Sequence, residues 1–288
     1  MSAEVVVTGS NVEHAAPGLP DTAGQRPPRP RLAANLARLA RVAARPLQRL
    51  IVPAACPACR TPLAEPDALC APCWSSVRFI VAPLCDRTGR PLPFQVDGPV
   101  VSAAALADPP DYDHARAVGL HQGALRTLVL DFKYRDRQDA RRLLGRLMEQ
   151  AGRDLIAEAD VIAPVPMPTL RLVQRHFNQS ALLAGELGRR TRLPVWYALL
   201  KRVRSTPRQV ELSGAARRNA PRGSVAVAKH LRSRIKGQSV LLIDDVITTG
   251  ATVSACARAL RAAGVRRVDV LAVTLSIGDT DTSALDLL

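Results

Sequence analysis

Residues 240–252, V-L-L-I-D-D-V-I-T-T-G-A-T, constrain the fold of this 288-residue chain more than any other segment. The first four are branched apolar residues, typical of a buried strand in a parallel sheet, and two adjacent carboxylates end this predicted strand. After a small polar turn, an apolar stripe recurs at helical spacing, at Val253, Cys256, Ala257 and Leu260. Gly264 predicts the end of that helix. This order predicts an α/β fold with a parallel sheet flanked by helices.

The same order suits a phosphorylated sugar. The backbone N–H groups of the turn would point out of a helix N-terminus, where the helix dipole favours an anion. The residues of this predicted anion loop are Thr248, Thr249, Gly250, Ala251 and Thr252. Asp244 and Asp245 would stand at the carboxyl end of the strand and accept hydrogen bonds from vicinal ribose hydroxyls. The alternative is a solvated acidic turn at the edge of a core.

Four cysteines form two C-x2-C pairs separated by ten residues, Cys56 with Cys59 and Cys70 with Cys73. Each short loop brings two thiolates toward one tetrahedral Zn2+, and four filled positions leave no place for a catalytic water, so the predicted zinc is structural. Disulfides are the alternative, but the sequence has no secretion signal. Cys85 has no second cysteine three residues later and is interpreted as a small buried residue.

A second cationic loop follows residues 161–163, which predict a short strand. Asn178 is well placed to cap a helix over residues 179–190. Arg171 and Arg175 lie between this strand and this helix start, where they would attract an anion. Further on, residues 202–223 are poor in apolar side chains and predict either a mobile cover over a reacting centre or a plain surface loop.

The net charge is +15 and the sequence pI is about 10.8. This balance favours anionic partners such as phosphates, nucleic acid or acidic lipid surfaces, although diffuse arginine accounts for much of it. Residues 31–52 predict a basic amphipathic helix, which would contact nucleic acid or a membrane surface, or pack on the protein's own body. With no apolar run of 18 residues and no signal peptide, we expect no membrane span and a cytoplasmic location.

Residues 240–252 closely resemble the phosphoribosyl pyrophosphate (PRPP) motif of type I phosphoribosyltransferases. About residues 53–276 resemble the ComF family, whose members join a small cysteine-rich module to such a domain. The family's pyrophosphate loop corresponds to P-V-P at 164–166 and to R-H-F-N-Q at 175–179, where His176 stands in place of a glycine. The family's K-Y-R segment corresponds to residues 133–135 and makes Lys133 a candidate contact to the diphosphate.

The resemblance implies a type I phosphoribosyltransferase-like domain preceded by a zinc-ribbon module. The predicted boundaries are a disordered tail at 1–30, the basic helix at 31–52, the ribbon at 53–93, the transferase-like domain at 100–278 and a tail at 279–288. Within the domain, residues 100–106 and 116–121 predict strands, and 124–132 predict a helix.

The resemblance also implies an activity. Mg2+-bound PRPP would be the substrate, held by Asp244, Asp245, the anion loop, Lys133 and Arg171, with Asp244, Asp245 and Arg175 as catalytic residues. Transfer of the phosphoribosyl group would release pyrophosphate, with Arg171 and Arg175 receiving the diphosphate. The family further implies a role in DNA uptake, with single-stranded DNA or a helicase-like protein as partner. The alternative is a non-catalytic accessory protein that senses PRPP or binds nucleic acid.

Overall fold

The computed structural model describes residues 54–94, 98–134, 138–168, 177–203 and 224–277. The predicted N-terminal tail and basic helix, and the C-terminal tail at 279–288, lie outside these ranges. Within the described part of the chain, no helix has the length and apolar character needed to cross a membrane.

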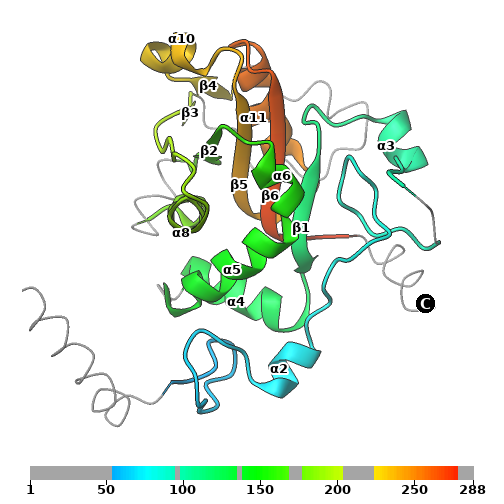
Figure 1. Cartoon of the computed structure of the whole chain (residues 1–288), viewed down its shortest axis with the longest axis vertical. Helices are drawn as coiled ribbons and strands as arrows, with labels where there is room; N and C mark the ends of the chain where they lie inside the picture. Colours follow the sequence, from blue (N-terminus) through cyan, green and yellow to red (C-terminus); the bar gives the residue numbers. More distant parts are fainter. Residues whose placement is uncertain (1–53, 95–97, 135–137, 169–176, 204–223, 278–288) are drawn as a thin grey trace, which may run out of the picture. The chain divides into compact units, whose positions relative to one another are not determined.

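A parallel sheet forms the centre of the larger domain (Figure 1). Its strands lie in the order β1 (Ala115–Leu120), β6 (Arg267–Leu275), β5 (Ser239–Ile247) and β2 (Val161–Pro164). Each neighbouring pair runs parallel. The predicted parallel α/β sheet is therefore confirmed, and β1 and β2 lie within a residue of their predicted positions.

The strand β5 is longer than its apolar run predicts. Asp244 and Asp245 lie inside the strand, because its register with β6 continues past them through Val246 opposite Thr274 and Ile247 opposite Leu275. The expectation that the strand ends at the acidic pair is wrong by two residues. The backbone of the acidic pair is consequently held by a sheet ladder, and only the side chains leave the sheet.

One face of the sheet is covered by the helices α4 (Gly123–Tyr134), α5 (Arg141–Ala151), α6 (Arg153–Ala157) and α8 (Gln179–Thr191). Leu241 and Ile243 of β5 point into this layer, where they join a cluster of buried side chains from the helices. Asn178 caps α8 as predicted, because its Oδ1 accepts a hydrogen bond from the N–H of Ser180 at 3.1 Å.

The opposite face is covered by α11 (Ala251–Arg261) and by the antiparallel pair β3 (Leu200–Arg202) and β4 (Val225–Val227). Val240 and Leu242 alternate onto this face, as the two-residue period of a strand requires. The predicted helical stripe is confirmed, since its four side chains are at most 1% exposed: Val253, Cys256, Ala257 and Leu260. The connection between β3 and β4, the predicted cover loop, lies outside the described residues from 204 to 223.

The cysteine-rich module packs against α4 and the outer edge of β1. Val77 lies in the same buried cluster as Leu125 of α4. Leu120 donates its N–H to the carbonyl of Arg78 at 2.8 Å, and Ile80 donates to Val118 at 3.1 Å. These contacts join the segment that leaves the module to the first strand of the sheet.

Residues 100–106 are not a strand. Ser102 caps the short helix α3 (Ala103–Ala107), because its side chain accepts a hydrogen bond from the N–H of Ala105. The alanine-rich sequence favours a helix once a cap is present. Cys85 is fully buried beside Leu92 and Ala105, in agreement with its interpretation as a small buried residue. The remaining short elements are α2 (Ala71–Ser75), η1 (Gln138–Ala140), η2 (Lys229–Leu231) and α10 (Arg232–Ile235).

Candidate functional site

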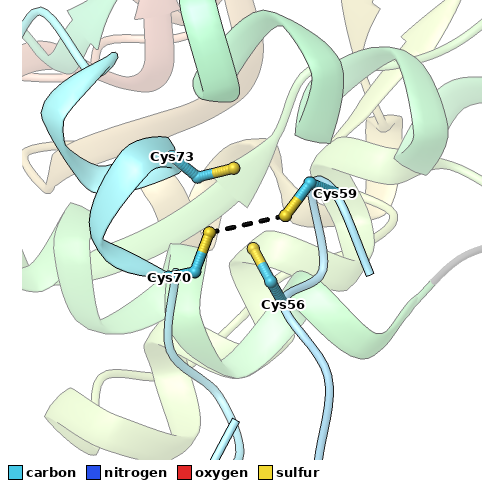
Figure 2. A group of neighbouring side chains, drawn as sticks. All are labelled: Cys56, Cys59, Cys70 and Cys73. Carbon is cyan, nitrogen blue, oxygen red and sulfur yellow. Dashed lines mark hydrogen bonds between the residues drawn. The ribbon is translucent and has the colours of Figure 1, made fainter. Parts of the chain in front are cut away.

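The four predicted zinc ligands come together (Figure 2). Their sulfur atoms all lie within 4.8 Å of one another, and the Sγ atoms of Cys59 and Cys70 are 3.4 Å apart. A tetrahedral zinc with Zn–S bonds of about 2.3 Å places its sulfurs about 3.8 Å apart, so the cluster has the size that this ion requires. All six cysteines of the chain are free of disulfides. The donor set is therefore that of a closed structural zinc site.

The surroundings of the cysteines shift the pKa values of their thiols. The hydroxyl and the backbone of Thr61, followed by Cys70 and Cys73, lower the pKa of the Cys59 thiol to about 6, and the Thr61 hydroxyl lies 3.1 Å from the Cys59 sulfur. A thiolate is the form that binds zinc. Burial, and then the neighbouring cysteines, raise the pKa of the Cys73 thiol. The positive charge of a bound zinc would favour the thiolate form of this residue.

Asp244 and Asp245 line a separate pocket of about 320 Å3 at the carboxyl ends of the strands. Lys133 also lines it, and its Nζ lies 3.1 Å from Oδ2 of Asp245. Thr248 and Thr252 of the predicted anion loop complete this side of the pocket. The structure thus brings the acidic pair, two of the five loop residues and the predicted lysine into one pocket, where open α/β sheets bind their ligands. Thr249, Gly250 and Ala251 are not among the residues that line it.

The two carboxylates differ in environment. Oδ1 of Asp244 accepts hydrogen bonds from the hydroxyl of Ser180 at 3.0 Å and from the N–H of Asp245 at 2.9 Å. Burial, and then the charge of Asp245, raise the pKa of Asp244 from 3.8 to about 7, while its two hydrogen bonds and Lys133 oppose the shift. Near neutral pH the Asp244 carboxyl group is therefore present in both its protonated and its ionised form, while Oδ2 of Asp245 faces Lys133.

The turn before α11 has the backbone conformation that a glycine allows. Gly250 has a φ of +75°, in the left-handed region that favours glycine, and it directly precedes the first residue of α11. Thr248 and Thr249 are exposed, and the N–H of Ala251 lies 3.4 Å from the Thr249 hydroxyl. The loop therefore leads into the N-terminus of α11, a helix of eleven residues, beside the acidic pair.

The second predicted cationic loop is not described. Arg171, Arg175 and His176 fall within residues 169–176, outside the described ranges, so their part in the site stays a prediction. The two ends of this loop are described, and both reach the same pocket through Pro166 and Asn178.

The structure adds pocket residues that sequence reasoning missed, namely His121, Gln179 and Ser180. Arg202, the first residue of the predicted cover segment, also lines the pocket. Ser180 holds Asp244, as described above. Gln179 is 1% exposed, and its Oε1 has no hydrogen-bond donor among the described residues. His121 directly follows β1, and the rule that ligands bind at the carboxyl ends of parallel strands could have identified it.

A larger hollow of about 590 Å3 lies elsewhere, along α5, α6 and the end of α8. It contains none of the predicted site residues. Of the arginines that line it, Arg190 pairs with Glu149 at 2.5 Å and Arg146 donates to the carbonyl of Asp67 at 2.6 Å. Arg153 also lines the hollow, so the choice between the two rests on the predicted site residues, which gather in the pocket beside the acidic pair.

Comparison with protein families agrees with this architecture. A double zinc ribbon domain matches residues 47–104, and a phosphoribosyl transferase domain matches residues 136–280. The fold and the cysteine cluster thus define a zinc ribbon joined to a phosphoribosyltransferase-type domain.

Two relatives of this chain show which family of such proteins it belongs to. The chain is 29% identical to competence protein F of Haemophilus influenzae, over 71% of this chain and 89% of that protein. It is 31% identical to the DNA utilization protein YhgH of Salmonella typhimurium, over 77% of this chain and 96% of that protein. The chain belongs to the ComF family. Among solved structures, the allosteric regulatory enzyme of purine biosynthesis shares 24% identity over 50% of this chain and 30% of that chain, with a TM-score of 0.33, too low to support an argument.

The double-ribbon match raises the question of a second metal. In the second half of the matched segment, Cys85 is the one cysteine, and its sulfur accepts a hydrogen bond from the N–H of Ser102 at 3.3 Å. Among the described residues, the cluster of Cys56, Cys59, Cys70 and Cys73 is the one group of three or more His, Cys, Asp or Glu side chains placed to hold a metal ion. The donor set of the second half therefore does not fit zinc.

Proposed function

We propose that the pocket beside β5 binds Mg2+-bound PRPP and that the domain transfers its phosphoribosyl group with release of pyrophosphate. The observation that carries the proposal is the placement of Asp244 and Asp245 in one pocket with Lys133, next to the glycine-containing turn before α11. A ribose offers hydroxyl donors to the acidic pair, and a 5′-phosphate suits the helix N-terminus.

Each group has a distinct task. Asp244 and Asp245 would orient the ribose and stabilise the positive charge that develops at its anomeric carbon. Thr248, Thr249, Gly250, Ala251 and Thr252 would hold the phosphate. Lys133, Arg171 and Arg175 would receive the diphosphate as its negative charge grows. Mg2+ would neutralise the diphosphate, bound largely by PRPP oxygens and water.

The proposed cellular role is in DNA utilization, as the names of the relatives suggest. The net charge of +15 favours contact with single-stranded DNA or with a helicase-like partner that carries it. A second candidate function is that of a PRPP-binding protein without turnover. It is favoured by His176, which stands where the family pattern has a glycine in the pyrophosphate loop.

Pyrophosphate release from Mg-PRPP distinguishes the two functions. If the domain is a transferase, Arg175→Ala should slow release much more than it weakens PRPP binding, because the charge on the departing diphosphate grows in the transition state. His176→Gly is the companion variant and should keep or increase turnover. If neither water nor any acceptor yields pyrophosphate from the wild-type protein, while PRPP binds, the transferase proposal is wrong and the binding function remains.

A further inference from the structure

His121 stands at the carboxyl end of β1, on the same pocket as Lys133 and Asp245. Its ring is partly buried, and its Nδ1 lies 2.9 Å from Oγ1 of Thr274. Thr274 belongs to β6, next to both β1 and β5, and is fully buried. The histidine is thus joined to the interior of the sheet by one ring nitrogen.

The contacts of Thr274 bear on which ring nitrogen of His121 carries the proton. The Thr274 hydroxyl lies 3.4 Å from the carbonyl oxygen of Asp245, which only accepts hydrogen bonds. A hydroxyl has one proton, and when Thr274 donates it to the Asp245 carbonyl, the hydroxyl accepts from Nδ1 of His121. In that arrangement the neutral ring has its proton on Nδ1, and Nε2 carries a lone pair. Within the described part of the chain, Nε2 makes no hydrogen bond.

The surroundings keep this ring neutral. Burial lowers the pKa of His121 below 6.5, and the positive charges of Lys133 and Arg126 lower it further, while the charge of Asp245 opposes them. The charged neighbours that face the ring thus come from α4 on one side and β5 on the other. Thr274, on β6, is uncharged.

The zinc ribbon holds the backbone on both sides of His121. On one side, Leu120 donates its N–H to the carbonyl of Arg78 at 2.8 Å. On the other side, Ala124 donates its N–H to the hydroxyl of Ser76 at 3.1 Å. Gly123 has a φ of +50°, and a Cβ at this position would lie 2.1 Å from the carbonyl oxygen of Ser76. The ring is therefore placed by the ribbon as well as by Thr274.

The two carboxylates of the pocket already have partners among the described residues. Asp245 pairs with Lys133, and Asp244 accepts from Ser180 and from the backbone. We infer that His121 is a catalytic residue, which accepts the proton of the acceptor nucleophile through Nε2. This role rests on the proposed transferase function and assigns the acceptor to compounds that bear an ionisable N–H or O–H group.

The step balances in atoms and charge. The lone pair of the acceptor nitrogen or oxygen forms a bond to the anomeric carbon of PRPP. The bond from that carbon to the diphosphate oxygen breaks, and its electron pair leaves with pyrophosphate. The proton of the acceptor moves to Nε2 of His121, and the resulting imidazolium returns it to solvent after the products leave. A positioned base of this kind contributes about 100- to 10,000-fold to the rate.

Two measurements test this role. The first is NMR of 15N-labelled ligand-free protein, in which ring-nitrogen shifts identify the tautomer of His121. We expect protonated Nδ1 and unprotonated Nε2 at pH 7.5, and a proton on Nε2 would overturn the inference. This measurement does not depend on PRPP.

The second measurement is pyrophosphate release from Mg-PRPP with water as the acceptor. His121→Asn keeps an N–H that can donate to Thr274 but removes Nε2, and we expect turnover to fall at least about 100-fold while PRPP affinity changes less than about threefold. The matched control is His230→Asn, since His230 is exposed and does not line the pocket. Imidazole added to His121→Ala should restore part of the turnover, which a purely structural role would not allow.

The outcomes separate this inference from the proposed function. Wild-type turnover that survives in His121→Asn overturns the role of His121 and leaves the transferase function intact. A wild-type protein that binds PRPP but never releases pyrophosphate overturns both. A wild-type protein that does not bind PRPP also overturns both, whatever tautomer His121 adopts.

Discussion

Replacing Asp244 with asparagine should stabilise the folded protein above neutral pH. The pKa of this carboxyl group is raised from 3.8 to about 7, chiefly by burial and then by Asp245. The folded state keeps the proton between pH about 4 and about 7, whereas the unfolded state has released it. The free energy of unfolding therefore falls as the pH rises through this window and stays low above it.

The size of the effect follows from the shift. A raised pKa costs the folded state on the order of a few kcal/mol for the ionised form above pH 7, because Asp244 is partly accessible to solvent and shares the shift with Asp245. Asparagine removes this cost but keeps an oxygen that can accept from Ser180 and from the N–H of Asp245. Its new amide N–H group needs a partner, which reduces the gain. We expect Asp244→Asn to raise the free energy of unfolding at pH 8 by about 2 to 4 kcal/mol.

The assay is urea unfolding at pH 5 and pH 8, with Glu65→Gln, an exposed carboxylate, as the control. The difference between Asp244→Asn and the wild type should be larger at pH 8 than at pH 5, and the control should show neither effect. If the asparagine variant is no more stable than the wild type at pH 8, the carboxyl group is not held in the costly environment that we describe.

Two further predictions concern the metal and the turn. Metal analysis of protein purified under reducing conditions should find one zinc per chain. A chelator should remove hydrogen-exchange protection from residues 54–80 while the sheet stays protected. Absence of zinc, or two zinc ions per chain, would contradict the closed single site. Gly250→Ala should lower the free energy of unfolding by about 1 kcal/mol or more and weaken Mg-PRPP binding, because alanine disfavours a φ of +75°. Unchanged thermal unfolding and PRPP affinity would show that the turn tolerates a side chain.

The elements that could be predicted are those with a local signal. Asn178 marks the start of α8 because a cap acts on N–H groups two or three residues away. The stripe that begins at Val253 identifies the buried side of α11 because a helix repeats every 3.6 residues. The cysteine spacing likewise predicts a cluster whose members lie within a few residues of each other in each pair.

The errors arise where distant residues decide the structure. The strand β5 continues through the acidic pair because β6 supplies partners as far as Leu275, and no property of residues 244–247 alone indicates this. The apolar residues of segment 100–106 predict a strand, but Ser102 and the run of alanines favour a helix.

The pocket was predicted only in part for the same reason. Its walls come from β1, β5, α4 and α8, so their meeting depends on the strand order β1-β6-β5-β2. The pairing of Lys133 with Asp245 and of His121 with Thr274 joins residues more than 100 positions apart. Sequence reasoning could place each residue near the end of an element, but it could not bring these partners together.

The central claim is that the acidic pair of β5 binds PRPP. Calorimetric titration of Mg-PRPP into the wild type and into the double variant Asp244→Asn, Asp245→Asn tests it most directly, with Glu65→Gln as the control and urea unfolding to verify the fold. At pH 8, where the Asp244 carboxyl group is ionised, we expect binding by the wild type and the control, and a loss of at least about tenfold in the double variant, because two charge-assisted hydrogen bonds become neutral ones. Equal affinity of a well-folded double variant, or no binding by the wild type, would contradict the account.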